Sequence, residues 1–319
     1  LYVGGLVGGM MQSNIQNSSS SASLSGINAE NVSGFGGIAG VVIDGTLTNC
    51  YATGNVDIAA EISALGIGGL AGGVQKSNAT ATITDCRASG TITAEGSDFV
   101  GGLIGTSTQA TIQQSKASGA VRGDQYVGGL AGAMDDTTTP GTLKNSYALG
   151  DVTGNENVGG LVGELVNETI INSYCSNTVT LNGGGSNQGG LVGTQSGSNT
   201  ITASYFDKTV NSGMPDEGDY GATTAELTSS CFFLTRDWDF DDETVNGLDD
   251  YWRSNGTDNS GYPTLAWEGN TNNISGSCPG AVTTDAITAT SITTEAATAE
   301  ATVNSLGYPD ATDHGVCWS

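Results

Sequence analysis

Short apolar runs recur along the first 210 residues, and each is bounded by Gly, Asn or Ser. They follow one phrase, Gly-Gly-(Leu or Ile)-x-Gly, whose seven copies begin 27 to 33 residues apart, at Gly4, Gly36, Gly68, Gly101, Gly128, Gly159 and Gly189. After each phrase comes an apolar residue with a second one nine positions further on, from Ile15 and Leu24 in the first copy to Ile201 and Val210 in the seventh. A period of this length indicates stacked repeats, and a fixed interval between variable connectors indicates packed strands joined by surface loops.

The glycine content excludes helical repeats, because each Gly inside a helix costs ~1 kcal/mol relative to Ala. Each repeat offers about three short runs rich in Val, Ile and Leu, which is the pattern of strands. We therefore expect an all-β fold. Residues 1–210 are predicted to form a right-handed parallel β-helix, a β-solenoid, of about seven coils that lie ~4.8 Å apart.

The repeat pattern stops after Lys208. Thr223 to Glu226 have the sequence of a capping box, which begins a short helix, and eight aromatic residues cluster between positions 232 and 267. Because a stacked rod needs its open edge covered, we predict that residues 211–270 form a C-terminal helix-plus-aromatic cap. The alternative for these rings is a platform that binds sugars.

Aligning the repeats places equivalent residues in ladders along the stack. The first ladder is mainly amides, which can hydrogen-bond along the stack: Asn17, Asn49, Asp85, Gln114, Asn145, Asn172 and Ala203. The second holds small residues suited to a tight corner: Ser18, Cys50, Cys86, Ser115, Ser146, Ser173 and Ser204. The third is a candidate ligand-binding stripe in which cations lie between tyrosines: Ser19, Tyr51, Arg87, Lys116, Tyr147, Tyr174 and Tyr205. A structural role is the alternative for all three.

The chain has 33 acidic and 8 basic residues and a formal charge of −25. Such a charge repels phosphate backbones and anionic lipids, so we expect no nucleic-acid partner. No apolar run reaches the ~18 to 20 residues that span a bilayer, so we expect no direct membrane insertion. The single histidine, His314, excludes chemistry based on His pairs from the repeats.

Cys50 and Cys86 occupy one ladder position in neighbouring coils, so their Cα atoms should lie ~4.8 Å apart. That separation falls in the disulfide range of ~4.4 to 6.8 Å and predicts a bond between them, with two buried thiols as the alternative. Cys231 and Cys278 form a second predicted pair, because both lie near the predicted cap.

Seven acidic residues lie between Asp237 and Asp250, a segment called the acidic segment below. Loop carboxylates supply the oxygen ligands that Ca²⁺ prefers. The candidate calcium ligands are Asp237, Asp239, Asp241 and Asp242. The spacing is not that of an EF-hand, and the alternative is a solvated acidic surface. We predict no other cofactor.

The seven phrases, with blocks of the type Asn-Ser-Tyr-Ala-x-Gly-x-Val after them, resemble the GLUG repeats of bacterial surface proteins over residues 1 to about 270. The terminal Gly-Val-Cys-Trp-Ser is similar to immunoglobulin-like repeats of Bacteroidetes surface proteins. Residues 271–319 are therefore expected to be a linker and the truncated start of such a module. The resemblance implies secretion and display at the bacterial cell surface as part of a longer protein, and it brings no catalytic motif.

We accordingly expect a secreted, non-enzymatic cell-surface adhesin or stalk segment, linked to other modules of the same chain. Its expected ligand is a glycan or a host surface protein, held by the connectors 72–83 and 132–143 or by the Tyr51–Tyr205 stripe. The alternative is a polysaccharide-degrading β-helix enzyme, a lyase or hydrolase. Such a hydrolase needs two carboxyl groups ~5 to 9.5 Å apart, whereas Asp57 and Asp151 align with no acidic residue in the other repeats.

Overall fold

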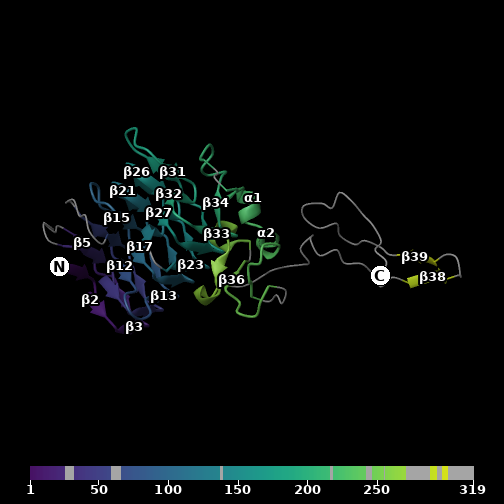
Figure 1. Cartoon of the computed structure of the whole chain (residues 1–319), viewed down its shortest axis with the longest axis horizontal. Coiled ribbons are helices and arrows are strands. Elements are labelled where there is room, and N and C mark those ends of the chain that lie inside the picture. The colour runs from purple at the N-terminus through teal and green to yellow at the C-terminus, as the bar shows by residue number, and fades with distance from the viewer. Residues whose placement is uncertain are drawn as a thin grey trace. The chain divides into compact units, whose positions relative to one another are not determined.

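The computed structural model describes residues 1–25, 32–58, 66–136, 139–215, 218–241, 246–254, 256–270, 288–292 and 297–300. The chain divides into two units, Leu1–Glu226 and Leu227–Ser319. In the first unit, short parallel strands stack into five sheets, named A to E, which run along the repeats (Figure 1). The predicted all-β parallel solenoid is confirmed.

Each sheet takes one strand from each repeat. Sheet A contains β1 (Tyr2–Gly4), β6 (Gly34–Gly36), β11 (Ile67–Gly68), β16 (Val100–Gly101), β21 (Gln125–Gly128), β26 (Glu156–Gly159) and β31 (Gln188–Gly189). Sheet B contains β2 (Val7–Met11), β7 (Ala39–Ile43), β12 (Ala71–Gln75), β17 (Ile104–Thr108), β22 (Ala131–Asp135), β27 (Val162–Val166) and β32 (Val192–Ser196). Sheet C contains β3 (Asn14–Gln16), β8 (Thr46–Thr48), β13 (Thr82–Thr84), β18 (Thr111–Gln113), β23 (Thr142–Lys144), β28 (Thr169–Ile171) and β33 (Thr200–Thr202).

The other two sheets differ in length at the C-terminal end of the stack. Sheet D contains β4 (Ser19–Ser20), β9 (Tyr51–Ala52), β14 (Arg87–Ala88), β19 (Lys116–Ala117), β24 (Tyr147–Ala148), β29 (Tyr174–Cys175), β34 (Tyr205–Asp207) and β35 (Gly221–Ala222). Sheet E contains β5 (Leu24–Ser25), β10 (Val56–Asp57), β15 (Ile92–Thr93), β20 (Val121–Arg122), β25 (Val152–Gly154) and β30 (Val179–Leu181). Each of the first six repeats therefore has five strands instead of the three predicted, because two-residue strands leave no apolar run in the sequence.

The stack has about six turns, since sheet E holds six strands and the seventh repeat supplies only β31 to β34. Val210, predicted to close a seventh coil, lies in a turn and is 42% exposed. The amide of buried Asn211 takes the place of the missing strand. It accepts a hydrogen bond from Val179 N–H at 3.0 Å and donates one to Asn177 O at 2.8 Å.

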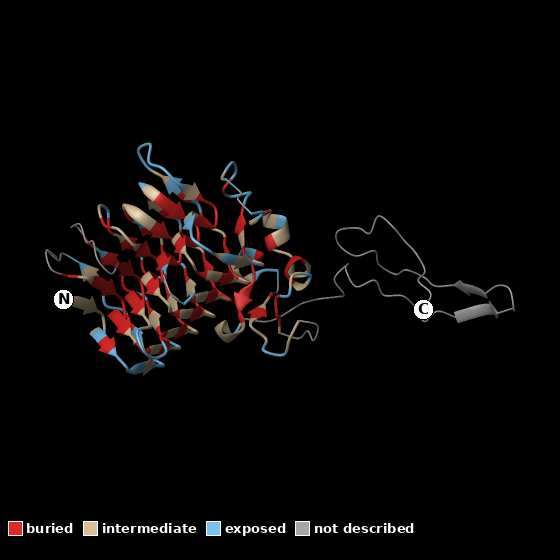
Figure 2. Ribbon diagram, in the orientation of Figure 1, coloured by how far each residue is buried: buried red, intermediate tan, exposed pale blue. Residues whose placement is uncertain are grey.

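The predicted register is confirmed in sheets C and E. Ile15, Leu47, Ile83 and their equivalents align in sheet C, and Leu24, Val56 and theirs align in sheet E. These residues belong to the interior or pack against it, and the buried residues there form two clusters. Figure 2 shows buried positions, in red, along the stack. One cluster lies between sheets B, C and D, and the other between sheets A and E.

The glycines of the repeated phrase are required by close packing. A Cβ on Gly160, the second glycine of its phrase, would lie 2.2 Å from Gly190 O in the next turn and 2.7 Å from Cys175 Sγ in sheet D. A Cβ on Gly163, the third, would lie 2.5 Å from Gly132 O in the previous turn. The second glycine thus lets the phrase contact sheet D and separates the two interior clusters.

The ladder of amides turns the corner between sheets C and D. All seven of its residues, Asn17 to Ala203, have positive φ between 45° and 54°. Asn and Asp tolerate this left-handed conformation better than other residues with a Cβ, which explains their frequency here. One amide–amide bond also runs along the stack, from Asn49 Nδ2 to Asn17 Oδ1 at 2.7 Å.

The ladder of small residues that follows is a continuous hydrogen-bond chain. Ser146 Oγ donates to Lys144 O at 2.8 Å and accepts from Ser115 N–H of the previous turn at 3.1 Å. The same pair of bonds recurs at Ser115 and Ser173. Because the left-handed corner takes these N–H groups out of the sheet, a side chain must accept their hydrogen bonds.

The predicted capping box is confirmed at the end of the first unit. Thr223 N–H donates to Glu226 Oε2 at 2.8 Å, and Glu226 N–H donates to Thr223 Oγ1 at 3.3 Å. They begin α1, a helix of only four residues, Thr224–Leu227. Just before it, β35 pairs with β34 and extends sheet D by one strand.

The second unit contains α2 (Ser230–Leu234), β36 (Trp252–Arg253), β37 (Thr264–Leu265), β38 (Thr288–Ile292), β39 (Ala297–Glu300) and two 3₁₀ helices, Asp258–Gly261 and Ala266–Glu268. Aromatic rings form its centre: Phe233 and Trp238 have ring centroids 4.3 Å apart, and Trp238 and Trp252 4.5 Å. These three rings are fully buried, which favours a core over a sugar platform. Capping by residues 211–270 and the right-handed winding stay predictions, and the module predicted over 271–319 lies mostly outside the described residues.

Candidate functional site

The predicted binding stripe forms one ladder along sheet D. The Arg87 guanidinium lies 4.5 Å from the centroid of the Tyr51 ring. Lys116 Nζ lies 5.4 Å from the Tyr147 centroid and 3.1 Å from its hydroxyl oxygen. The structure therefore contains the predicted stripe, in which two neighbouring cations lie between tyrosines.

The middle of this stripe is not an open surface. Tyr147 and Tyr174 stack with centroids 5.0 Å apart, and their exposed fractions are 1% and 0%. Tyr51, Arg87, Lys116 and Tyr205 are half-buried. Tyr147 and Tyr174 thus act as core residues, and a ligand of the stripe would meet only its other members.

The predicted disulfide between Cys50 and Cys86 is absent: both are free, buried thiols. Their side chains point the same way in successive turns, and each thiol donates to the carbonyl two residues before it, at Thr48 and Thr84. Cys50 N–H donates to Cys86 Sγ at 3.4 Å, so the two cysteines continue the serine chain. Burial raises the pKa of the Cys86 thiol and makes it a poor nucleophile.

Cys231 is disulfide-bonded. The other member of the predicted Cys231–Cys278 pair, Cys278, lies outside the described residues, so this pairing stays a prediction.

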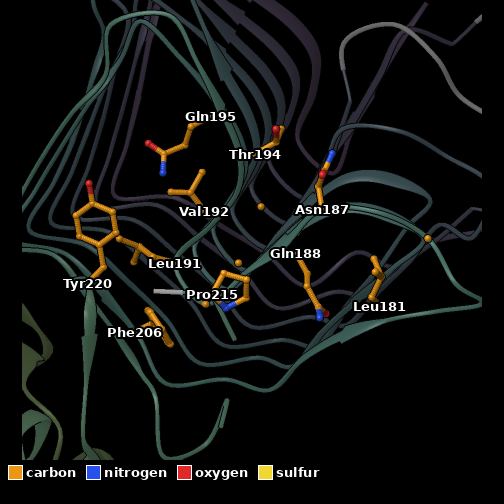
Figure 3. A pocket seen from close by; sticks show the side chains of 14 residues that line it. Leu181, Asn187, Gln188, Leu191, Val192, Thr194, Gln195, Phe206, Pro215 and Tyr220 are labelled. Carbon is orange, nitrogen blue, oxygen red and sulfur yellow. The ribbon is translucent and has the colours of Figure 1, made fainter. Parts of the chain in front are cut away.

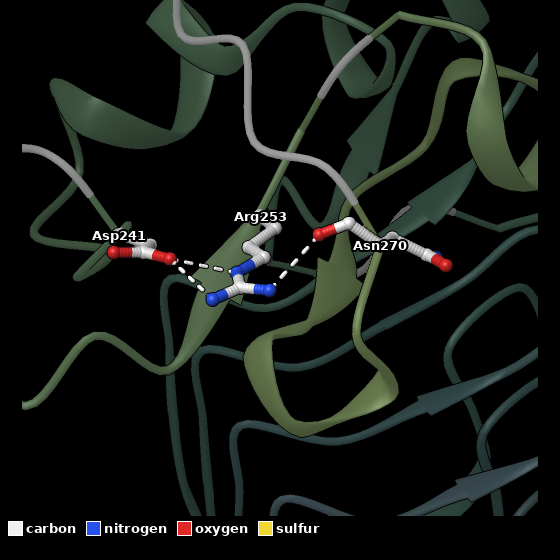
Figure 4. Close-up of polar contacts among 3 residues, drawn as sticks. All are labelled: Asp241, Arg253 and Asn270. Atoms are coloured by element: carbon white, nitrogen blue, oxygen red, sulfur yellow. Dashed lines mark hydrogen bonds and ion pairs between the residues drawn. The ribbon is translucent and has the colours of Figure 1, made fainter.

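In the acidic segment, two of the four candidate calcium ligands, Asp241 and Asp239, bind other groups of the protein. Arg253 binds Asp241 Oδ2 through Nη2 at 2.6 Å and Nε at 2.7 Å, and its Nη1 donates to Asn270 O at 2.9 Å (Figure 4). Asp239, 6% exposed, accepts from Asp249 N–H at 3.1 Å. Asp242 lies outside the described residues, among which no three acidic, His or Cys side chains are grouped to hold a metal ion. Calcium binding stays a prediction.

Two buried carboxyl groups organise the predicted recognition connectors. Asp44 accepts N–H bonds from Ser77, Asn78 and Ala79, which lower its pKa and fasten the connector 72–83. Glu168 is 1% exposed, and neither of its carboxyl oxygens accepts a well-formed hydrogen bond from the described residues. Burial, followed by the charge of Asp136, raises the pKa of Glu168 to about 8. Both connectors thus have structural carboxyl groups at their base.

A pair of aromatic residues was missed by the sequence analysis. Phe99 and Tyr126 stack with centroids 4.9 Å apart and both have φ of 55°, a strained conformation for bulky side chains. Both are partly exposed. Burial and the charges of Glu164, Glu156 and Asp98 raise the pKa of Tyr126, so the pair lies in an acidic surface.

A cavity of about 500 Å³ opens at the last turn of the stack (Figure 3). Strands β31 and β32 and the chain from Phe206 to Tyr220 contribute its walls. Its polar side chains are all neutral: Asn187, Gln188, Thr194, Gln195 and Tyr220. Its size is that of a small-molecule site, and nothing in its described lining is charged.

The cavity lies where two ladders of the repeat that are apolar or nearly so in the earlier turns hold glutamine instead. Gln188 aligns with Val158 in sheet A, and the six earlier turns all have an apolar residue at this position. Gln195 aligns with Leu165 in sheet B, where the earlier turns have five apolar residues and Ser107. This departure is visible in the aligned sequence, and it is the signal from which the cavity could have been predicted.

The third repeat provides the link to known proteins, because it contains the phrase from Gly68 and the block from Ile83 to Ile92 in the register just described. Residues 63–93 match the GLUG motif. The predicted resemblance is confirmed for this stretch, and the other six copies of the phrase share its register, as expected of a GLUG-repeat region. No significant match was found among curated proteins or solved structures. None of the helices in the described ranges has the length and apolar composition of a membrane span.

Proposed function

We propose that this chain is a non-enzymatic segment of a secreted bacterial cell-surface protein, which forms a stiff stalk and contributes an adhesive surface. The observation that carries the proposal is that every repeated residue of the GLUG array stabilises stacking. Glycines allow close contact, asparagines form the corner, and serines satisfy the corner's N–H groups. A rod built from such repeats becomes longer when further copies of the repeat are added, because each turn contacts mainly its neighbours.

The surface residues that vary between turns are the ones available for recognition. They include the connectors held by hydrogen bonds to Asp44 and Asp136, the half-buried members of the Tyr51–Tyr205 stripe and the cavity at the last turn. A glycan or a surface protein of a host cell is the proposed ligand. A charge of −25 keeps the array soluble and repels acidic polymers, which favours a neutral partner.

The test is binding of the purified chain to arrays of neutral and acidic glycans and to host cells, with polysaccharide turnover measured in parallel. The proposal expects saturable binding and no release of reducing or unsaturated sugar ends. Turnover of any polysaccharide would refute the stalk and favour the β-helix lyase or hydrolase. Absence of binding to all glycans and cells would refute the adhesive part.

A further inference from the structure

We infer that the cavity at the last GLUG turn binds a neutral sugar residue that carries an acetamido group, through the amides of Gln188 and Gln195 and the backbone N–H groups of Leu191 and Val192. This inference rests on the proposed adhesive function and assigns it a site. Its first support is a pair of unused backbone donors.

At each of the six junctions between turns, two successive N–H groups converge on one carbonyl oxygen of the next turn. Leu161 and Val162 N–H both donate to Leu191 O, at 2.9 and 3.2 Å, and the five earlier junctions repeat this arrangement. Leu191 and Val192 are the same two residues of the last turn. Within the described part of the chain, neither of their N–H groups has an acceptor. They form an empty site shaped for one carbonyl oxygen.

The groups around this donor pair select the ligand. The side-chain amides of Gln188 and Gln195 have no hydrogen-bond partner among the described residues, and both line the cavity with Thr194 (Figure 3). Amide side chains both donate and accept, as sugar hydroxyls do. The half-buried Tyr220 ring offers an apolar face in the same wall. The absence of charged side chains from the described lining excludes ion pairing as the basis of recognition.

An acetamido sugar matches this set because its carbonyl oxygen accepts two N–H bonds and its methyl group packs on the accessible apolar part of the lining, which includes Pro215 and the half-buried Tyr220 ring. A further hydrophobic turn in the same place fits less well, since it would bury Gln188 and Gln195 without their present access to water. Gln188 and Gln195 therefore favour a polar ligand in the cavity over a further turn of the solenoid.

The test uses the whole chain with chitotriose as probe and cellotriose as its matched control, since the two differ in the acetamido groups. Saturation-transfer NMR and calorimetric titration should detect chitotriose, with cellotriose at least about tenfold weaker because two hydrogen bonds to the carbonyl are lost. Equal binding of both trisaccharides would overturn the acetamido assignment. No binding of chitotriose would overturn the site.

Two variants locate the site without disturbing the fold. Gln188→Val and Gln195→Leu restore the residues of the preceding turn, Val158 and Leu165, so thermal stability should be retained. The double variant should weaken chitotriose binding at least about tenfold. As a control, Arg122→Gln changes an exposed residue of sheet E that belongs to none of the proposed binding surfaces, and it should leave chitotriose binding unchanged. If the chain binds other glycans or cells but the double variant binds chitotriose as the original chain does, the inference fails while the proposed function stands.

Discussion

The buried carboxyl group of Glu168 makes the stability of the repeat array depend on pH. Burial and the neighbouring charge of Asp136 raise its pKa from 4.5 to about 8, and Asp135 adds to the effect. The folded state therefore holds a proton that the unfolded state releases. The stabilisation from this group is complete below pH ~4.5 and is lost as the pH rises to about 8.

The magnitude follows from the shift. A difference of about 3.5 pKa units, 8 minus 4.5, corresponds to at most ~5 kcal/mol at ~1.36 kcal/mol per unit. Local relaxation that admits water reduces this value, so we expect ~2 to 5 kcal/mol between pH 5 and 9. Glu168→Gln keeps the size of the side chain and removes the titration. At pH 9 the variant should be more stable than the original chain by that amount, and near pH 5 the two should be equal.

The assay is urea unfolding followed by circular dichroism at pH 5, 6, 7, 8 and 9. Glu95→Gln is the matched control, because Glu95 is exposed and its replacement removes the same charge from the same array. Any general effect of the charge of −25 therefore cancels in the comparison. Parallel stability curves for Glu168→Gln and the original chain from pH 5 to 9 would refute the reasoning.

Three further predictions test the repeat and the acidic segment. Ser146→Ala should lower the free energy of urea unfolding by ~1 to 3 kcal/mol, because Ser115 N–H loses its buried acceptor. Ser146→Cys should cost less, since cysteine occupies this position in two turns. Equal losses for the two variants would contradict the hydrogen-bond chain. Gly160→Ala should cost ~3 kcal/mol because its Cβ would lie 2.2 Å from Gly190 O, and an unchanged unfolding midpoint would show that the turns can separate. Calcium binding by the acidic segment predicts a melting temperature that rises in millimolar Ca²⁺ and falls in EDTA, and identical values in both solutions would exclude it.

The sequence predicted the stacking and its register because both depend on spacing. The interval of nine residues fixes two inward positions per turn, and any other register would place apolar side chains outside. It did not predict five sheets, since strands of two residues such as Tyr51–Ala52 have no pattern of their own. Nor did it predict the free thiols, because a Cα spacing of ~4.8 Å permits a disulfide without turning two parallel side chains toward each other.

The binding surfaces were less predictable, because exposure depends on what packs above a ladder. Tyr147 and Tyr174 have the same residue type as Tyr51, yet they are buried and it is not. The cavity, in contrast, leaves a signal in the sequence, because Gln188 and Gln195 interrupt two apolar ladders at the last turn. Terminal repeats often have polar residues because they face water, so the two glutamines alone would also fit a solvated end of the stack. The N–H groups of Leu191 and Val192, which have no acceptor among the described residues, are what favours a binding site.

The corner two residues before the first glycine of each repeated phrase provides a last test of which positions the fold leaves free. In five successive turns the residue at this corner has positive φ: Gly66, Phe99, Tyr126, Asn157 and Asn187. Glycine and asparagine fit that conformation, whereas a bulky side chain costs ~1 to 2 kcal/mol there. Stacking of the Phe99 and Tyr126 rings returns ~0.5 to 1.5 kcal/mol, so it does not exceed the strain. The double variant Phe99→Asn and Tyr126→Asn should therefore unfold within ~1 kcal/mol of the original chain, or at higher urea. A loss above ~2 kcal/mol would show that the ring pair holds the turns together. The predicted result would mean that the pair is not needed for folding, and that this partly exposed, acidic surface is one that the repeat can vary without losing its stack.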